Sequence, residues 1–286
     1  MTSFWKRLPV IVRAVLTGFA SAAAGTMPWA GLAALNLKHW PAVPWAVPPA
    51  ALYLWLFWRY VCGAGWPRST AAARRANVRA NALADDVWSY ALVAGGLGLA
   101  ALVALLHVLN QMVHLPQKST ADLANVPAVS LFILLAMSAA VAGIVEEASF
   151  RGFMQAPIER SHGPFVAILV TGSVFSLVHL THLEVTLALL PYYLAVGAIY
   201  GMLAHLTNSI LPSMVLHAGG NMLGSLDLLT RGQAEWQAPA RPAALIWEIG
   251  VGTAFWGSVI AFVVIGAIAI VAYVALARAT RRAAKA

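Results

Sequence analysis

The chain has 286 residues, of which 61% are hydrophobic and 10% are charged, and its formal net charge is +8. Soluble domains carry about 25% charged residues, so this composition excludes a soluble surface and makes the lipid bilayer the solvent. The basic residues lie at the ends of apolar segments, which favours a role in membrane topology over nucleic-acid binding. The single cysteine, Cys62, excludes an internal disulfide and a thiolate metal site.

Apolar segments long enough to cross a bilayer recur along the whole chain. Because a span needs about 20 mostly apolar residues, we expect an all-α fold, a polytopic transmembrane helix bundle with about eight spans. No polar stretch is long enough for a separate domain, so residues 1–286 are expected to form a single membrane domain. The predicted spans are 9–35, 43–62, 87–113, 126–147, 164–181, 185–205, 210–229 and 244–277.

The distribution of basic residues predicts the orientation of these spans. Basic residues precede the first span, crowd the loop 63–86 and follow the last span, which predicts that both termini are cytoplasmic. The expected location is the cytoplasmic (inner) membrane of a cell. The Ala-rich loop 63–86 is either an amphipathic surface helix or a solvated loop whose arginines only set orientation, and we favour the solvated loop. Residues 231–243 are expected to form an external loop.

The first polar cluster contains two adjacent acids, Glu146 and Glu147, at the end of the predicted span 126–147. Adjacent helical residues point about 100° apart, so the two acids are expected to do different work. Glu147 aligns with Arg151 one turn later and is expected to pair with it. Glu146 has no local cation, which suits a general base in an apolar site. The alternative is a cytoplasmic helix end that carries interfacial charges.

A second polar pair, Phe175 and His179, has the same four-residue spacing. A lone histidine in a membrane helix is often only an interhelical hydrogen-bonding group, so His179 by itself favours a structural role. His182 and Glu184 follow near a span end, where water is close and a structural role is again expected.

The third pair, His217 and Asn221, flanks two glycines. Gly219 and Gly220 would allow another helix, or an extended substrate, to approach closely. A polar pair at this depth needs buried partners or a function, because a charged residue at the bilayer centre costs at least about 2.5–3.5 kcal/mol.

The three clusters together resemble the signature of the CPBP family, the membrane endopeptidases that include the CAAX prenyl proteases and bacteriocin-processing enzymes. The family pattern is Glu-Glu-x-x-x-Arg, then Phe-x-x-x-His, then His-x-x-x-Asn, and it is filled here at 146–151, 175–179 and 217–221. The resemblance covers a catalytic core of about 126–229. The N-terminal spans within 9–113 and the C-terminal span 244–277 carry no recognised signal.

The resemblance implies an intramembrane endopeptidase that acts on a peptide or a membrane protein in the lipid bilayer, with no nucleic acid. A non-catalytic scaffold or regulator of the same fold is the alternative. Peptide hydrolysis needs a base near a water molecule and donors aimed at the developing oxyanion. The implied roles are Glu146 as general base, His179 as the residue that polarises the water, His217 and Asn221 as oxyanion donors, and Glu147 and Arg151 as supporting residues.

Metal dependence stays open on the sequence alone. Glu146, His179 and His217 could supply the three protein ligands of a catalytic zinc site. Against this, Asn221 is a poor zinc ligand but a good hydrogen-bond donor, and no His-Glu-x-x-His motif is present. A metal-free, glutamate-type mechanism therefore fits at least as well as a divalent metal such as zinc.

Overall fold

The structure is a computed structural model that describes residues 5, 7–113, 126–179, 187–231 and 244–285, the side chains of 227–231 excepted. Every regular element in these ranges is helical, which confirms the predicted all-α fold. The elements are α2 Val10–His39, α3 Val47–Val61, η1 Arg68–Thr70, α4 Ala71–Val78, α5 Asp85–Met112, α6 Ala128–Val141, η2 Ala142–Gln155, α7 Ala156–His179, η3 Leu187–Leu189, α8 Leu190–Thr207, α9 Leu211–Arg231, α10 Ile246–Ile249 and α11 Thr253–Ala283. The predicted loop 231–243 (except Arg231), His182 and Glu184 lie outside the described residues.

Several of these helices are suited to cross a membrane. Within the described ranges, five helical segments are long and apolar enough, namely Val10–His39, Asp85–Met112, Ala128–His179, Leu187–Thr207 and Thr253–Ala283. The chain is therefore a multi-pass membrane protein. Helix α3 has only 15 residues and is not among the five, and α9 is not either, so the count of eight spans stays a prediction.

Two predicted span boundaries are wrong. The helix predicted to end at 147 continues through η2 into α7 and bends only at Gly163, whose φ is 81°. Charges usually mark a helix end at the membrane surface, but here they lie inside a continuous helix because they pair with one another. The predicted span 244–277 is likewise interrupted at Gly250, with a φ of 82°, and α11 begins at Thr253 and continues to Ala283.

The basic loop 63–86 is not simply solvated, contrary to the favoured prediction. It contains the helix α4, and two of its arginines, Arg74 and Arg79, are 5% and 6% exposed. Arg74 donates from Nε to the carbonyl of Tyr60 (2.8 Å) and from Nη2 to that of Ala64 (2.8 Å). These arginines therefore satisfy backbone carbonyls inside the protein, a role that charge counting does not reveal.

The contacts between Cα atoms divide the chain into two compact units. The first unit contains Met1–Asn81, Thr120–Ala167 and Ser213–Glu235, and the second contains Ala82–Ser119, Ile168–Pro212 and Trp236–Ala286. The predicted core 126–229 is thus shared: its middle stretch 168–212 belongs to the second unit, and the rest belongs to the first.

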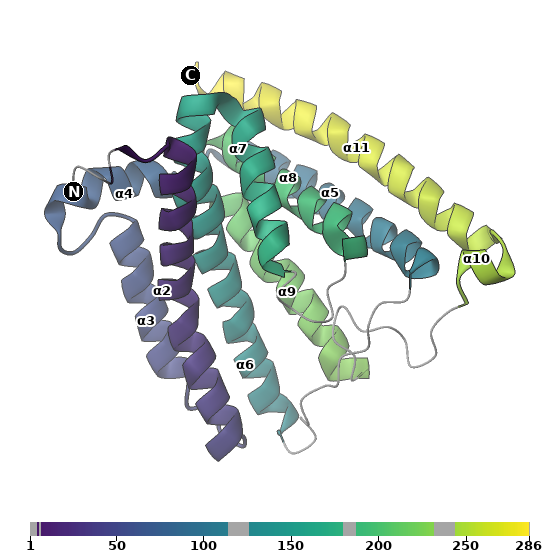
Figure 1. The fold of residues 1–286 in the computed structure, drawn as a ribbon, viewed down its shortest axis with the longest axis horizontal. Helices are drawn as coiled ribbons and strands as arrows, with labels where there is room; N and C mark the ends of the chain where they lie inside the picture. The colour runs from purple at the N-terminus through teal and green to yellow at the C-terminus, as the bar shows by residue number, and fades with distance from the viewer. Residues whose placement is uncertain (1–4, 6, 114–125, 180–186, 232–243, 286) are drawn as a thin grey trace. The chain divides into compact units, whose positions relative to one another are not determined.

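In the first unit, α2 runs antiparallel to α6 and η2 (Figure 1). Trp29 donates from Nε1 to Ser138 Oγ (3.0 Å) on α6, whereas Gly25 faces Val145 on η2. A Cβ at Gly25 would lie 2.3 Å from Val145 Cγ1, so only glycine lets the two helices approach this closely. Since Gly25 lies near the midpoint of α2, the acids that follow Val145 lie level with the middle of a candidate membrane span.

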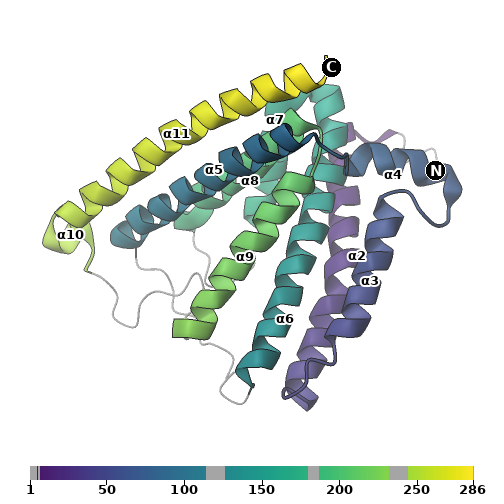
Figure 2. The same ribbon diagram turned by 180° about the vertical axis from the view of Figure 1, so that it is seen from behind.

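In the second unit, α11 lies along α5, as Figures 1 and 2 show from opposite sides. Tyr273 of α11 donates a hydrogen bond to the carbonyl of Ile199 on α8 (3.0 Å). The end of α7 crosses α8 at two glycines: a Cβ at Gly197 would lie 2.7 Å from the Cα of Gly172. This backbone-to-backbone contact places Tyr193, one turn before Gly197, close to the end of α7.

Candidate active site

The first polar cluster lies on the π-helical segment η2, most of which is buried. All residues from Glu147 to Gln155 are buried. Its backbone hydrogen bonds connect residues five apart, a register that is rare and occurs frequently at functional sites. The sequence did not predict this register, because its apolar pattern does not distinguish a π-helix from an α-helix.

Glu147 and Arg151 form the predicted ion pair. Arg151 donates from Nη1 to Glu147 Oε1 at 3.0 Å, and the two side chains are 1% and 0% exposed. Each charge compensates the other in a region from which water is excluded. Breaking such a pair by removing one partner typically costs about 3–5 kcal/mol, because the remaining charge stays buried and uncompensated.

His217 of α9 lies against both acids. Its Nδ1 is 2.8 Å from Glu147 Oε1, and its Nε2 is 3.8 Å from Glu146 Oε2. An ionised carboxylate only accepts hydrogen bonds, so we assign the proton of this contact to Nδ1. Glu147 thereby fixes the orientation of the ring and directs Nε2 toward Glu146. This contact joins residues 70 positions apart, and the four-residue spacings did not predict it.

A glycine on η2 allows α9 to bring His217 this close. A Cβ at Gly143 would lie 2.8 Å from the carbonyl oxygen of Met214 and 2.8 Å from Ala218 Cβ. Any larger residue would push α9 away, and His217, which lies between these two contacts, would lose Glu147. Gly143 is therefore part of the site, although no motif marked it in the sequence.

Glu146 differs from its neighbour in exposure. Its side chain is 26% exposed, whereas that of Glu147 is fully buried. The two adjacent acids thus lie in different environments, and the different work expected of them stays a prediction. A partly exposed carboxylate beside an oriented imidazole is accessible to a water molecule, whereas Glu147 is occupied by Arg151 and His217.

Two glycines of α9 border space that no described atom fills. A Cβ at Gly219 or Gly220 would meet no described atom within 4 Å. The tight helix–helix contact considered for these two glycines is therefore not found among the described residues. Asn221 lies one turn after His217, and its backbone carbonyl accepts a hydrogen bond from Ser225 Oγ (2.8 Å).

His179 belongs to the second unit and lies in an aromatic setting. Its Nδ1 is 2.8 Å from the carbonyl oxygen of Phe175, and its ring centroid is 4.4 Å from the ring of Phe175, as the four-residue spacing predicts. The ring of Tyr193 on α8 lies at the same distance, 4.4 Å. Tyr193 was not predicted from the sequence, because a tyrosine in an apolar helix has no spacing that links it to His179.

One segment of the chain matches a known protein family. Residues 127–223 match the family model of the Rce1-like type II CAAX prenyl endopeptidases. This segment, about a third of the chain, confirms the resemblance predicted from the motifs. No curated protein and no solved structure matches the chain. The Rce1-like segment contains all six residues of the predicted set.

Among the described residues, no three His, Cys, Asp or Glu side chains form a group that could hold a metal ion. In the first unit, the Glu146 carboxylate faces His217 Nε2, whereas Glu147 contacts Arg151 and His217 Nδ1. A catalytic zinc has three protein ligands, and the third residue of the predicted set, His179, belongs to the second unit. The predicted ligand set Glu146, His179 and His217 stays a prediction.

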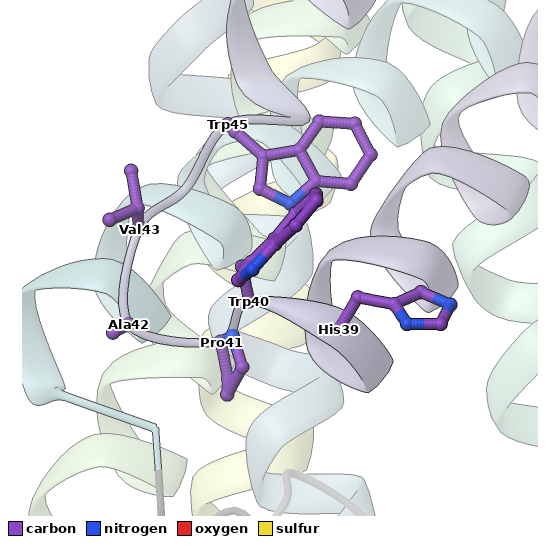
Figure 3. Close-up of a pocket in the computed structure, with 6 residues that line it drawn as sticks. All are labelled: His39, Trp40, Pro41, Ala42, Val43 and Trp45. Atoms are coloured by element: carbon purple, nitrogen blue, oxygen red, sulfur yellow. The ribbon is translucent and has the colours of Figure 1, made fainter.

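A separate apolar hollow lies in the turn between α2 and α3, before the Rce1-like segment (Figure 3). The buried side chain of Asn36 builds this turn: its Nδ2 donates to the carbonyls of Trp40 and Val43, both at 3.0 Å. No carboxylate is present in the hollow, so we assign it no chemistry. It is lined by His39, Trp40, Pro41, Ala42, Val43 and Trp45.

Proposed function

We propose that this chain is an intramembrane endopeptidase in which Glu146 activates the water that hydrolyses a peptide bond. The Rce1-like match supports a CAAX-type peptidase in general terms. One observation carries the more specific proposal: the partly exposed Glu146 carboxylate faces the imidazole of His217, whose other nitrogen is held by a buried ion pair. A base beside an oriented imidazole suits hydrolysis better than it suits a passive scaffold.

The intramembrane location of the chemistry rests on the packing of α2. Val145 contacts the midpoint of this candidate span, so Glu146 lies far from either end of α2. Ionisable residues at such a depth usually line a water-filled cavity and carry a function. By the charge bias of the loops, we place both termini on the cytoplasmic side of the inner membrane.

In the proposed reaction, Glu146 takes one proton from a water molecule while the water oxygen attacks the carbonyl carbon of the peptide. The carbonyl oxygen becomes an oxyanion. Glu146 then gives the proton to the peptide nitrogen as the C–N bond breaks. The products are a carboxylic acid and an amine, and Glu146 is again ionised.

His217 is suited to stabilise the oxyanion when both of its nitrogens carry protons. Nδ1 then donates to Glu147, and Nε2 donates to the oxyanion. The charges of Glu146, Glu147, Arg151 and this imidazolium cancel, which lowers the cost of holding them in an apolar region. Loss of one oxyanion donor typically lowers kcat by about 10²–10³-fold.

Two further residues take the roles implied by the resemblance. We propose that His179 polarises the water and that Asn221 is a second oxyanion donor. The contact of His179 Nδ1 with the Phe175 carbonyl supports this role, because it makes Nε2 the acceptor nitrogen of the neutral ring. The space beside Gly219 and Gly220 supports the approach of an extended peptide or membrane-protein segment next to His217.

The proposal is tested with full-length protein in detergent and a quenched library of membrane-partitioning peptides. We expect cleavage by the wild type and a loss of about 10²–10⁴-fold in Glu146→Gln, the range that general bases contribute. The matched control is Asp85→Asn, which removes an exposed carboxylate at the start of α5 and should leave cleavage unchanged.

Two other outcomes, and one added measurement, are informative. Undiminished turnover in Glu146→Gln would contradict the proposed mechanism. A wild type that cleaves no peptide in the library would favour the scaffold alternative. A parallel lane with a chelator tells whether cleavage requires a metal.

A further inference from the structure

The C-terminal end of α4 packs against the segment that carries the proposed active site. A Cβ at Gly152 on η2 would lie 3.0 Å from the Cα of Val78 and 3.4 Å from the carbonyl oxygen of Asn77. All of these α4 atoms belong to the backbone, so neither side has a flexible group that could move aside. Glycine at 152 therefore allows the α4 brace, residues 77–79, to lie directly on η2.

Arg79, the last residue of the α4 brace, has an unusual backbone conformation. Its φ is 53°, in the left-handed region that favours glycine and is costly for a side chain as large as arginine. Such strain persists only where the surroundings enforce it, and it clusters at functional sites. The residue is 6% exposed, so its side chain lies inside the protein.

The Arg79 guanidinium makes two contacts inside the first unit. Nη2 donates to the backbone carbonyl of Arg151 at 2.7 Å, and Nη1 donates to Glu159 Oε2 at 2.9 Å. Gln155 donates to the same Glu159 oxygen (3.2 Å) and so holds that carboxylate in place. Burial lowers the pKa of Arg79 and the nearby Glu159 carboxylate opposes this effect, so the ion pair keeps the arginine charged.

These contacts lie where the helix changes its hydrogen-bonding register. The N–H of Ala156 donates to the carbonyl of Gly152, four residues back, so α-helical bonding resumes here after the π-helical segment. A change of register leaves the local backbone less constrained by its own hydrogen bonds. An external donor at the carbonyl of Arg151 fixes the helix at this point.

We infer that Arg79 is a positioning residue for the proposed active site. A chain of short contacts leads from it to the base: Arg79 holds the backbone of Arg151, the Arg151 side chain holds Glu147, and Glu147 holds His217, whose Nε2 faces Glu146. A displacement of about 1 Å within a catalytic set can cost about 10²-fold in rate. This inference rests on the proposed function, because it assigns Arg79 to the same site.

The test compares Arg79→Gln and Arg79→Lys with Arg160→Gln in the full-length protein. Arg160 is a matched control because it is exposed and joins α7 to the same end of α4, through hydrogen bonds to the carbonyl of Ala76 and the side chain of Asn77. The kcat and KM are measured on a peptide that the wild type cleaves and are normalised to the folded fraction. In parallel, the ¹⁵N resonances of the His217 ring are recorded in histidine-labelled protein.

We expect Arg79→Gln to lower kcat by about 10-fold or more with KM within about twofold, because the contacts to the reacting groups loosen while the substrate path is unchanged. Arg79→Lys should recover part of kcat, since an ammonium can replace one of the two contacts. The His217 Nδ1 resonance should shift in Arg79→Gln and stay unchanged in Arg160→Gln.

The role of Arg79 would be overturned by either of two results. One is a loss of folded protein in Arg79→Gln with kcat per folded molecule and the His217 resonances unchanged, which indicates stability alone. The other is an equal fall of kcat in Arg160→Gln. If the wild type cleaves no peptide, the proposed function fails, whereas the His217 resonances still decide whether Arg79 positions the ring.

Discussion

The two histidines with the clearest settings, His217 and His179, are held in different ways. His217 in the first unit contacts carboxylates at both ring nitrogens. His179 in the second unit lies between the rings of Phe175 and Tyr193, with Nδ1 on a backbone carbonyl. Charge therefore orients one imidazole, whereas aromatic packing and a backbone carbonyl orient the other.

The two settings predict different responses to substitution. A buried charge cannot lose its partner without remaining uncompensated, so damage in the first unit should be large. Ring contacts are weaker and more graded, because a smaller or rotated ring keeps part of the contact. Substitutions in the two units therefore test this contrast.

Arg151→Met should be the most damaging single substitution. It leaves the fully buried Glu147 carboxylate without its cation, for which we expect a loss of about 3–5 kcal/mol in the free energy of unfolding. The measurement is denaturant or thermal unfolding in detergent. The double variant Glu147→Met with Arg151→Met should recover much of this stability but no activity. A double variant that is as unstable as Arg151→Met would contradict the charge argument.

In the second unit, Gly197→Ala should be the comparable test of packing. The added Cβ would lie 2.7 Å from the backbone of Gly172, so α7 and α8 must separate. Overpacking of this kind typically costs about 1–3 kcal/mol. Gly96→Ala on α5 is the control: no described atom lies within 4 Å of its Cβ, and alanine should be neutral or stabilising by up to about 1 kcal/mol. Equal thermal stability of the two variants would refute the close crossing.

Tyr193→Leu should give the smallest effect. It removes the ring that lies 4.4 Å from His179, and an aromatic pair contributes about 0.5–1.5 kcal/mol beyond its buried area. We expect a modest loss of stability and a lower kcat, because the imidazole becomes less well oriented. Tyr193→Phe keeps the ring and should behave as the wild type in both measurements. A Tyr193→Phe variant as impaired as Tyr193→Leu would show that the hydroxyl, and not the ring, is what matters.

Local contacts were predictable from the sequence, and contacts between helices were not. The four-residue spacing places Glu147 with Arg151 and Phe175 with His179 on one helix face, and both contacts are found. The contact of His217 with Glu147 depends on how α9 packs on η2. One glycine, Gly143, makes that packing possible, and nothing in the sequence links it to the histidine.

The boundary error at 147 has a physical cause as well. Charged residues in an apolar chain usually mark the membrane surface, so Glu146 was placed at a helix end. In the structure, the acid after it pairs internally and the helix continues to Gly163. Arg79 was not predicted for a related reason. Five arginines lie in or near the loop 63–86, and the sequence does not show which of them is buried. Only the backbone conformation and the burial of Arg79 reveal that it points inward.

The position of Glu146, level with the middle of α2, has a consequence for what happens after a bond is cut. Hydrolysis would create a new carboxylate and a new ammonium group where the uncut chain had a neutral amide. A charged group at the centre of a bilayer costs at least about 2.5–3.5 kcal/mol, so both fragments become poorly soluble in the layer where they form. The reaction itself would therefore expel its products toward water and disfavour rejoining of the two ends.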